Sequence, residues 1–157
     1  MNSKQQEQFV AAMARNMATA HEGAGNVDVR SGPKNLIPGA SGFRHQVDVS
    51  VHTDKDLILY ECKYWGGNVD PEAILALAAR GIDIHGAHPN QLVVLNIVVS
   101  HDLTSGAQLL AQEFKIGCHV AKSAAEFRVG YKTDWATGAI DNMALSETAH
   151  AELHPKP

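Results

Sequence analysis

The chain has 157 residues, of which 45% are hydrophobic and 19% are charged, and its formal net charge is −4 with histidine neutral. This composition is typical of a single soluble domain that is large enough to bury its own core. The acidic balance excludes a simple polybasic nucleic-acid binder, and no apolar run approaches the roughly 20 residues of a membrane helix.

The first predicted elements are a helix and a short strand. Apolar residues at helical spacing predict a helix over residues 3–20, with Ser3 as its N-cap. Alternating β-branched residues then predict a strand over residues 27–30, and a loop rich in glycine and proline extends to residue 42. The apolar face of the helix is formed by Phe9, Val10, Met13 and Met17.

Two strands and a turn follow this loop. Residues 45–52 alternate strictly between polar and apolar side chains, residues 53–56 have the composition of a turn, and residues 57–64 form a second apolar strand. The three segments together predict a β-hairpin.

The remaining elements alternate between helix and strand. Asp70 is a good N-cap before Pro71 and predicts a helix that ends near Gly81. The apolar segment 91–100 predicts a buried central strand, and Thr104 or Ser105 caps a further helix before a last strand over residues 118–121. We therefore expect an α/β fold over residues 1–121, with a central mixed sheet and helices on both faces, and a C-terminal extension over 122–157 that is a docked helix or a mobile tail.

The register of the hairpin decides which side chains share a face. A turn centred between Asp54 and Lys55 pairs Asp48 with Glu61, and side chains alternate between the two faces of each strand. One face is predicted to be core and the other to be polar at one end. The core face comprises Val47, Val49, Val51, Ile58, Tyr60 and Cys62, and the second face comprises Gln46, Asp48, Glu61 and Lys63 at one end and Leu57 and Leu59 at the other.

The polar end of this face has two interpretations. Opposed carboxylates repel one another with their Cβ atoms about 5 Å apart, and a divalent cation between Asp48 and Glu61 would remove that repulsion. Mg²⁺ accepts one or two carboxylates, and the backbone carbonyl of Cys62 is a further candidate ligand. Alternatively, Lys63 neutralises both carboxylates in a surface salt bridge. The spacing alone leaves both interpretations open.

The segment "PGASGFRHQVDVSVHTDKDLILYECKYW" resembles the PD-(D/E)XK nuclease superfamily and, within it, the Mrr-like restriction endonucleases. The segment "SHDLTSGAQLLAQEFKIGCHV" extends the resemblance to about residue 121. Val47 stands where the superfamily name implies proline, a frequent departure. Many Mrr-like proteins have glutamine where this chain has Glu61, so the acidic form of the motif is intact.

The resemblance implies a restriction-endonuclease-like core and a metal-dependent endonuclease acting on DNA. It implies that Asp48 and Glu61 bind Mg²⁺, with Mn²⁺ as a substitute, and that Lys63 is the catalytic lysine. Cutting both strands of a duplex implies a homodimer. The rival interpretation is a catalytically inactive nuclease-like module used for nucleic-acid binding or assembly, which the acidic net charge favours.

Other candidate residues flank this motif. Glu7 is a candidate accessory acid, although a solvated helix position explains it equally simply. The glycine-rich loop before the motif is expected to contact substrate phosphates through its backbone amides. The candidate substrate-binding residues are Ser41, Gly42, Arg44, His45 and Gln46.

Localisation is predicted from the start of the chain and from its cysteines. Residues 1–8 are polar and lack the apolar core of a signal peptide, and Cys62 and Cys118 lie in apolar contexts. We therefore expect a reduced, cytoplasmic compartment and no membrane partner.

Overall fold

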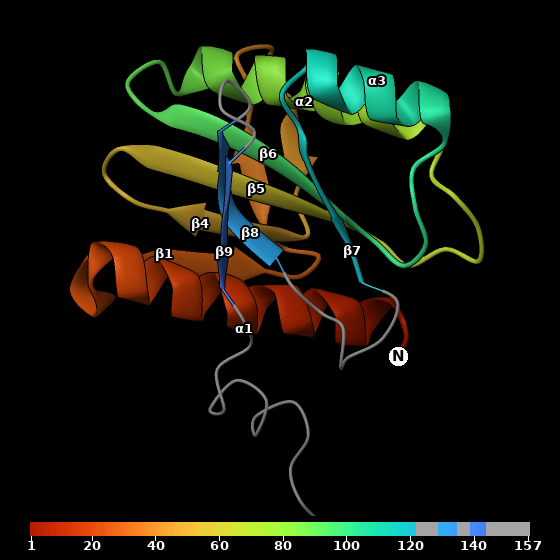
Figure 1. The fold of residues 1–157 in the computed structure, drawn as a ribbon. Helices are drawn as coiled ribbons and strands as arrows, with labels where there is room; N and C mark the ends of the chain where they lie inside the picture. The colour runs from red at the N-terminus through yellow and green to blue at the C-terminus, as the bar shows by residue number, and fades with distance from the viewer. Residues whose placement is uncertain (122–128, 135–138, 144–157) are drawn as a thin grey trace, which may run out of the picture.

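Figure 1 shows the computed structural model, which describes residues 1–121, 129–134 and 139–143. Five strands form a mixed sheet in the spatial order β1-β4-β5-β6-β7. The pairs β1–β4 and β4–β5 are antiparallel, and the pairs β5–β6 and β6–β7 are parallel. The strands are β1 Asp28–Ser31, β4 Val49–His52, β5 Asp56–Lys63, β6 Leu92–Val99 and β7 Gly117–Val120.

Helices cover both faces of this sheet, which confirms the predicted α/β architecture. The helix α1 (Ser3–Glu22) lies against one face, and α2 (Pro71–Ala87) and α3 (Ser105–Glu113) lie against the other (Figure 1). The predicted apolar face of α1 is buried against side chains of β4 and β5. In the described part of the chain, no helix is both long and apolar enough to cross a membrane.

Local chemistry sets where the helices begin and end. The N-cap of α1 is Asn2 and not Ser3, because Asn2 and Gln5 form a reciprocal capping box, with each side chain accepting the other's backbone amide. Asp70 caps α2 as predicted, but the helix continues past Gly81 because Ile84 extends its buried face. Thr104 caps α3.

Two small sheets accompany the main one. Strands β2 (Leu36–Pro38) and β3 (Arg44–Gln46) pair with each other, and η1 (Ala24–Asn26) is a short 3₁₀ turn after α1. In the C-terminal segment, β8 (Val129–Asp134) and β9 (Ala139–Met143) form an antiparallel pair. The expected docked helix or tail otherwise falls on residues 122–128, 135–138 and 144–157, which lie outside the described residues. The domain boundary near residue 121 remains a prediction.

The predicted continuous strand over residues 45–52 is wrong, because the chain changes sheets within it. The buried Asn35 explains the break: its backbone carbonyl accepts the amide of Val47 at 3.0 Å, and its side-chain amide donates to the carbonyl of Val47 at 2.9 Å. The same amide donates to the hydroxyl of Ser50 at 3.0 Å. The backbone of Val47 is therefore satisfied outside the β4–β5 ladder, which ends at the pair of Val49 and Tyr60.

This break also corrects the predicted faces of the hairpin. Val47 packs on the α2 side of the sheet, not with Val49 on the α1 side. The second face is covered rather than open, because Leu57 and Leu59 are buried with Val47 beneath Ile84 of α2. Strand β5 is thus buried on both faces along most of its length, and only its last residues, from Glu61 onward, are partly exposed.

Candidate active site

The charged end of β5 forms a compact ion-pair cluster. The ammonium of Lys63 lies 2.9 Å from Oε1 of Glu61, and the guanidinium of Arg80, on α2, lies 2.6 Å from Oε2 of the same carboxylate. The side chain of Glu61 is only 12% exposed, so both contacts are formed with much of the surrounding water removed. Lys63 also lies 5.3 Å from the ring centroid of Trp65, which holds its ammonium from a second side.

Asp48 lies directly before β4 and reaches across to β5. Its Oδ2 accepts the backbone amide of Cys62 at 2.8 Å, and its Oδ1 accepts the side-chain amide of Gln46 at 3.3 Å. The carboxylate of Asp48 thus takes a place on β5 that the main chain of β4 would take in a regular ladder. Asp48 and Glu61 are brought close without being a backbone pair.

Negative charge accumulates at this end of the sheet. Partial burial raises the pKa of Asp48, and the charge of Glu61 raises it further, against the lowering effects of the Cys62 amide, Gln46 and Lys63. Glu7 on α1 belongs to the same field, because its pKa is raised first by burial and then by the charges of Asp48 and Glu61. The structure therefore brings this residue within electrostatic reach of the two carboxylates.

Cys62 lies between these acids but has little chemistry of its own. Burial raises the pKa of its thiol well above the usual value, and Asp48, Glu7 and Glu61 raise it further. The thiol therefore stays neutral and is a poor nucleophile. The role of its backbone carbonyl as a metal ligand remains a proposal.

The glycine-rich loop before β3 is tied to α2 through Asp83. The carboxylate of Asp83 accepts the backbone amide of Ser41 at 2.9 Å and its hydroxyl at 2.7 Å, and it lies 2.7 Å from Nε2 of His45. These hydrogen bonds, His45 first, lower the pKa of Asp83 to about 2. Of the predicted substrate-binding residues, Ser41 and His45 thus contact α2, and Gln46 contacts Asp48.

The other two predicted loop residues face solvent. Gly42 adopts a positive φ of 88° and is exposed, as is Arg44. No Cβ placed on Gly42 would meet another atom, so its need for glycine is conformational rather than spatial. Both remain free to meet a ligand, and their role in substrate binding remains a prediction.

Arg80 and Asp83 were not among the residues predicted from the sequence. Arg80 follows Leu77 by three residues and precedes Ile84 by four, so it stands at the border of the buried face of α2. A cation in that position indicates a buried acidic partner, and this signal was present in the sequence. Asp83 has no such signal, because its partners lie about 40 residues earlier in the chain.

The donor set was compared with the needs of a divalent cation. Among the described residues, no three or more histidine, cysteine, aspartate or glutamate side chains are grouped closely enough to hold a metal. Asp48 and Glu61 nonetheless suit Mg²⁺, which uses one or two carboxylates and keeps several waters. The mutual repulsion of the acids is the feature that a cation would relieve, so the residues fit a water-rich site rather than an all-protein cage.

Comparisons with known proteins concern the fold. No protein-family model and no curated protein matches the sequence. A crystal structure of a protein of unknown function, AF1548, is similar with a TM-score of 0.53 and 16% identity, over 71% of this chain and 56% of that one. A repair endonuclease from Pyrococcus abyssi is similar with a TM-score of 0.42 and 17% identity, over 70% of this chain and 46% of that one. The chain spans about half the length of either structure, and the similarity to AF1548 shows a shared fold.

Proposed function

We propose that this protein is a metal-dependent DNA endonuclease that hydrolyses phosphodiester bonds. The observation that carries the proposal is the contact of Lys63 with Glu61 at 2.9 Å beside Asp48, which is bound to the next residue of β5. Two acids and a lysine at one partly exposed strand end match the motif that resembles the PD-(D/E)XK superfamily. The nuclease domain comprises residues 1–121, with 122–157 as an extension.

In this proposal each residue has a separate task. Asp48 and Glu61, with the carbonyl of Cys62, hold Mg²⁺ or Mn²⁺, which polarises the scissile phosphate and lowers the pKa of a bound water. The Cys62 amide orients Asp48, and Arg80 orients Glu61. Lys63, held between Glu61 and Trp65, orients the attacking water and stabilises the negative charge that develops on the phosphate.

The test is cleavage of DNA by the purified full chain. Supercoiled plasmid and linear duplex are incubated with Mg²⁺ or Mn²⁺, with and without EDTA. We expect cleavage that EDTA abolishes, that Lys63→Ala abolishes and that Lys55→Ala retains, because Lys55 is an exposed lysine in the turn at the other end of β5. The proposal fails if wild-type protein cuts neither substrate, or if the two lysine variants cut alike. The same experiment at graded protein concentrations tests the proposed homodimer, because a second-order dependence of double-strand cleavage is expected.

One observation favours a second function, a catalytically inactive module for binding or assembly. Arg80 contacts the second oxygen of Glu61, so two cations already neutralise this carboxylate without a metal. A structural ion-pair network of this kind stabilises the sheet end and requires no catalysis. The module predicts that the chain binds DNA or a protein partner but is indifferent to EDTA.

A further inference from the structure

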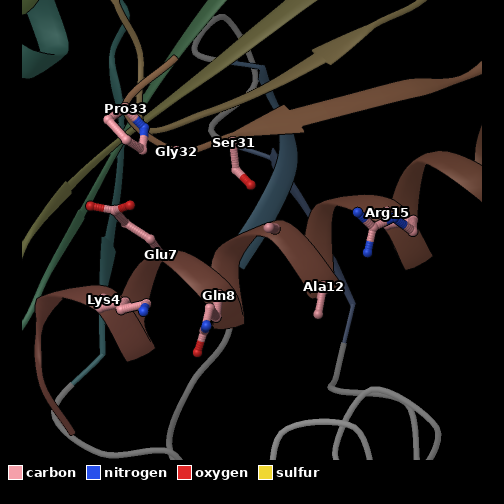
Figure 2. A pocket seen from close by; sticks show the side chains of 9 residues that line it. Lys4, Glu7, Gln8, Ala12, Arg15, Ser31, Gly32 and Pro33 are labelled. Atoms are coloured by element: carbon pink, nitrogen blue, oxygen red, sulfur yellow. The ribbon is translucent and has the colours of Figure 1, made fainter. Parts of the chain in front are cut away.

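A cavity of about 710 Å³ lies beside α1 and extends to the turn that follows β1 (Figure 2). Its volume falls in the range of ligand-binding clefts. The helix supplies one wall, and the segment Ser31–Pro33 supplies another. The described residues that line it are Lys4, Glu7, Gln8, Ala11, Ala12, Arg15, Ser31, Gly32 and Pro33.

The helical wall has a cation at each end and small side chains between them. Lys4 and Arg15 are eleven residues apart, which is close to three full turns, so they lie on one side of α1 and about 16 Å apart along its axis. Both are exposed, and Figure 2 shows them at opposite ends of the labelled set. Ala11 and Ala12 lie between them and leave space at the bottom of the cavity. An extended anion fits this pattern better than a compact one.

The cavity is adjacent to the candidate active site. Glu7 lines it, and the carboxylate of Glu7 is repelled by those of Asp48 and Glu61. On the other wall, the backbone amide of Gly32 donates to the carbonyl of Asp48 at 3.3 Å. A ligand lying along α1 would therefore pass directly beside the proposed metal ligands.

Charge along the chain supports an anionic ligand here. Residues 1–47 contain five lysine and arginine residues against three acidic residues, although the whole chain has a net charge of −4. The positive part of this acidic protein is thus the part that contains both walls of the cavity. A local basic surface of this kind attracts a polyanion even when the net charge does not.

We propose that this cavity receives the sugar–phosphate backbone of one DNA strand, with Lys4 and Arg15 contacting phosphates on either side of the scissile bond. The inference rests on the proposed function for the identity of the ligand. The distance of about 16 Å corresponds to four or five nucleotides of one strand at about 3.4 Å each. Phosphate contacts position a strand without reading its sequence, so the cavity sets where the strand lies and not which sequence is cut.

The test is the affinity of wild-type protein and variants for a fluorescent duplex, measured by anisotropy in EDTA so that no cleavage occurs. Lys4→Gln and Arg15→Gln each remove one cation, and Gln8→Glu adds a negative charge in the cavity. Lys55→Gln and Gln112→Glu make the same charge changes on exposed residues outside it. Thermal melting checks that each variant is folded.

The three cavity variants are expected to weaken binding about five- to tenfold, equally for unrelated sequences, and the two controls less than twofold. Loss of both cations should reduce the slope of log affinity against log salt by about 2. No binding by wild-type protein, or equal losses in the cavity variants and the controls, would overturn the proposal.

A parallel cleavage assay separates this inference from the proposed function. If wild-type protein cuts DNA but Lys4→Gln and Arg15→Gln bind it normally, the cavity assignment is wrong and the nuclease proposal stands. If the cavity variants bind weakly as expected but wild-type protein cuts nothing, the cavity assignment stands and the nuclease proposal is wrong.

Discussion

The carboxylate of Asp48 accepts the backbone amide of Cys62 at 2.8 Å and so joins β4 to β5 through a side chain where the regular ladder has already ended. The bond orients Asp48 toward the end of β5 on which Glu61 and Lys63 lie. It also removes one backbone amide of β5 from the set that a metal or a substrate would have to satisfy. The candidate site is therefore built on an interruption of the sheet.

The first prediction separates the acids from the lysine by their dependence on Mg²⁺. Asp48→Asn and Glu61→Gln each remove a negative charge from the proposed metal ligands, so cleavage should fall and be partly restored at high Mg²⁺. Lys63→Ala should lower the rate by about 100-fold or more at every Mg²⁺ concentration, because it removes a contact to the reacting groups. The measurement is cleavage rate against Mg²⁺ concentration. Rescue of Lys63→Ala by Mg²⁺ would contradict the assigned roles.

The second prediction concerns Arg80. Arg80→Met removes one of two cations from the partly buried carboxylate of Glu61, which should lower the free energy of unfolding by about 1–2 kcal/mol. The same change should tighten Mg²⁺ binding severalfold, because a positive charge near the proposed site is lost. Urea denaturation and calorimetric Mg²⁺ titration measure the two effects. Arg44→Met, at an exposed position, serves as the control and should change neither; unchanged or weaker Mg²⁺ binding by folded Arg80→Met would argue against a metal at Glu61.

The third prediction concerns the attachment of the glycine-rich loop. Asp83→Ala removes the bonds to Ser41 and His45, so the loop should open locally with little change in the melting temperature. Trypsin should then cleave after Arg44 several times faster, while cleavage after Lys55 keeps its wild-type rate. Mass spectrometry of timed digests measures both sites together. Equal rates after Arg44 in the two proteins would show that Asp83 does not hold the loop.

The fourth prediction is a pH dependence of stability. His119 is buried and contacts the Oδ1 of Asn96 at 3.1 Å, and burial lowers its pKa from 6.5 to about 4. The unfolded chain therefore takes up a proton that the folded chain refuses. Stability contributed in this way is fully present above pH 6.5 and is lost as the pH falls from 6.5 toward 4, by up to about 1.4 kcal/mol per pH unit.

Urea denaturation at pH 7, 6 and 5 measures this loss. His119→Gln keeps an amide donor for Asn96 but does not titrate, so its stability should fall less steeply over the same interval. Equal slopes in the two proteins would show that His119 does not contribute. His101→Gln, at an exposed histidine, is the control and should retain the wild-type slope.

The sequence predicted the elements and the hairpin register because both depend on neighbouring residues. Alternation in residues 57–64 and a short turn are enough to pair Val49 with Tyr60 and Val51 with Ile58, as the structure shows. The break before Asp48 depends on Asn35, which lies twelve residues before Val47 and has no periodic signal. Local pattern therefore predicted the ladder correctly but not where it ends.

The candidate site divides in the same way. Asp48, Glu61 and Lys63 lie on segments whose pairing could be predicted, and their closeness follows from it. The partners that α2 supplies could not be placed, because they depend on how a helix packs across the sheet. The contact of Arg80 with Glu61 spans 19 residues, and that of Asp83 with Ser41 spans 42. Such contacts are tertiary and leave only weak marks in a single sequence.

The positions of Arg80 and Asp83, three residues apart on α2, make that helix a mechanical link between two parts of the protein. Arg80 holds the carboxylate of Glu61, and Asp83 holds the loop that contains Ser41 and His45. A helix moves as a stiff rod over so short a distance, so a displacement that strains one contact strains the other. Pressure on the loop from a bound molecule would thus be transmitted to the charge balance at Glu61, through a lever one helical turn long.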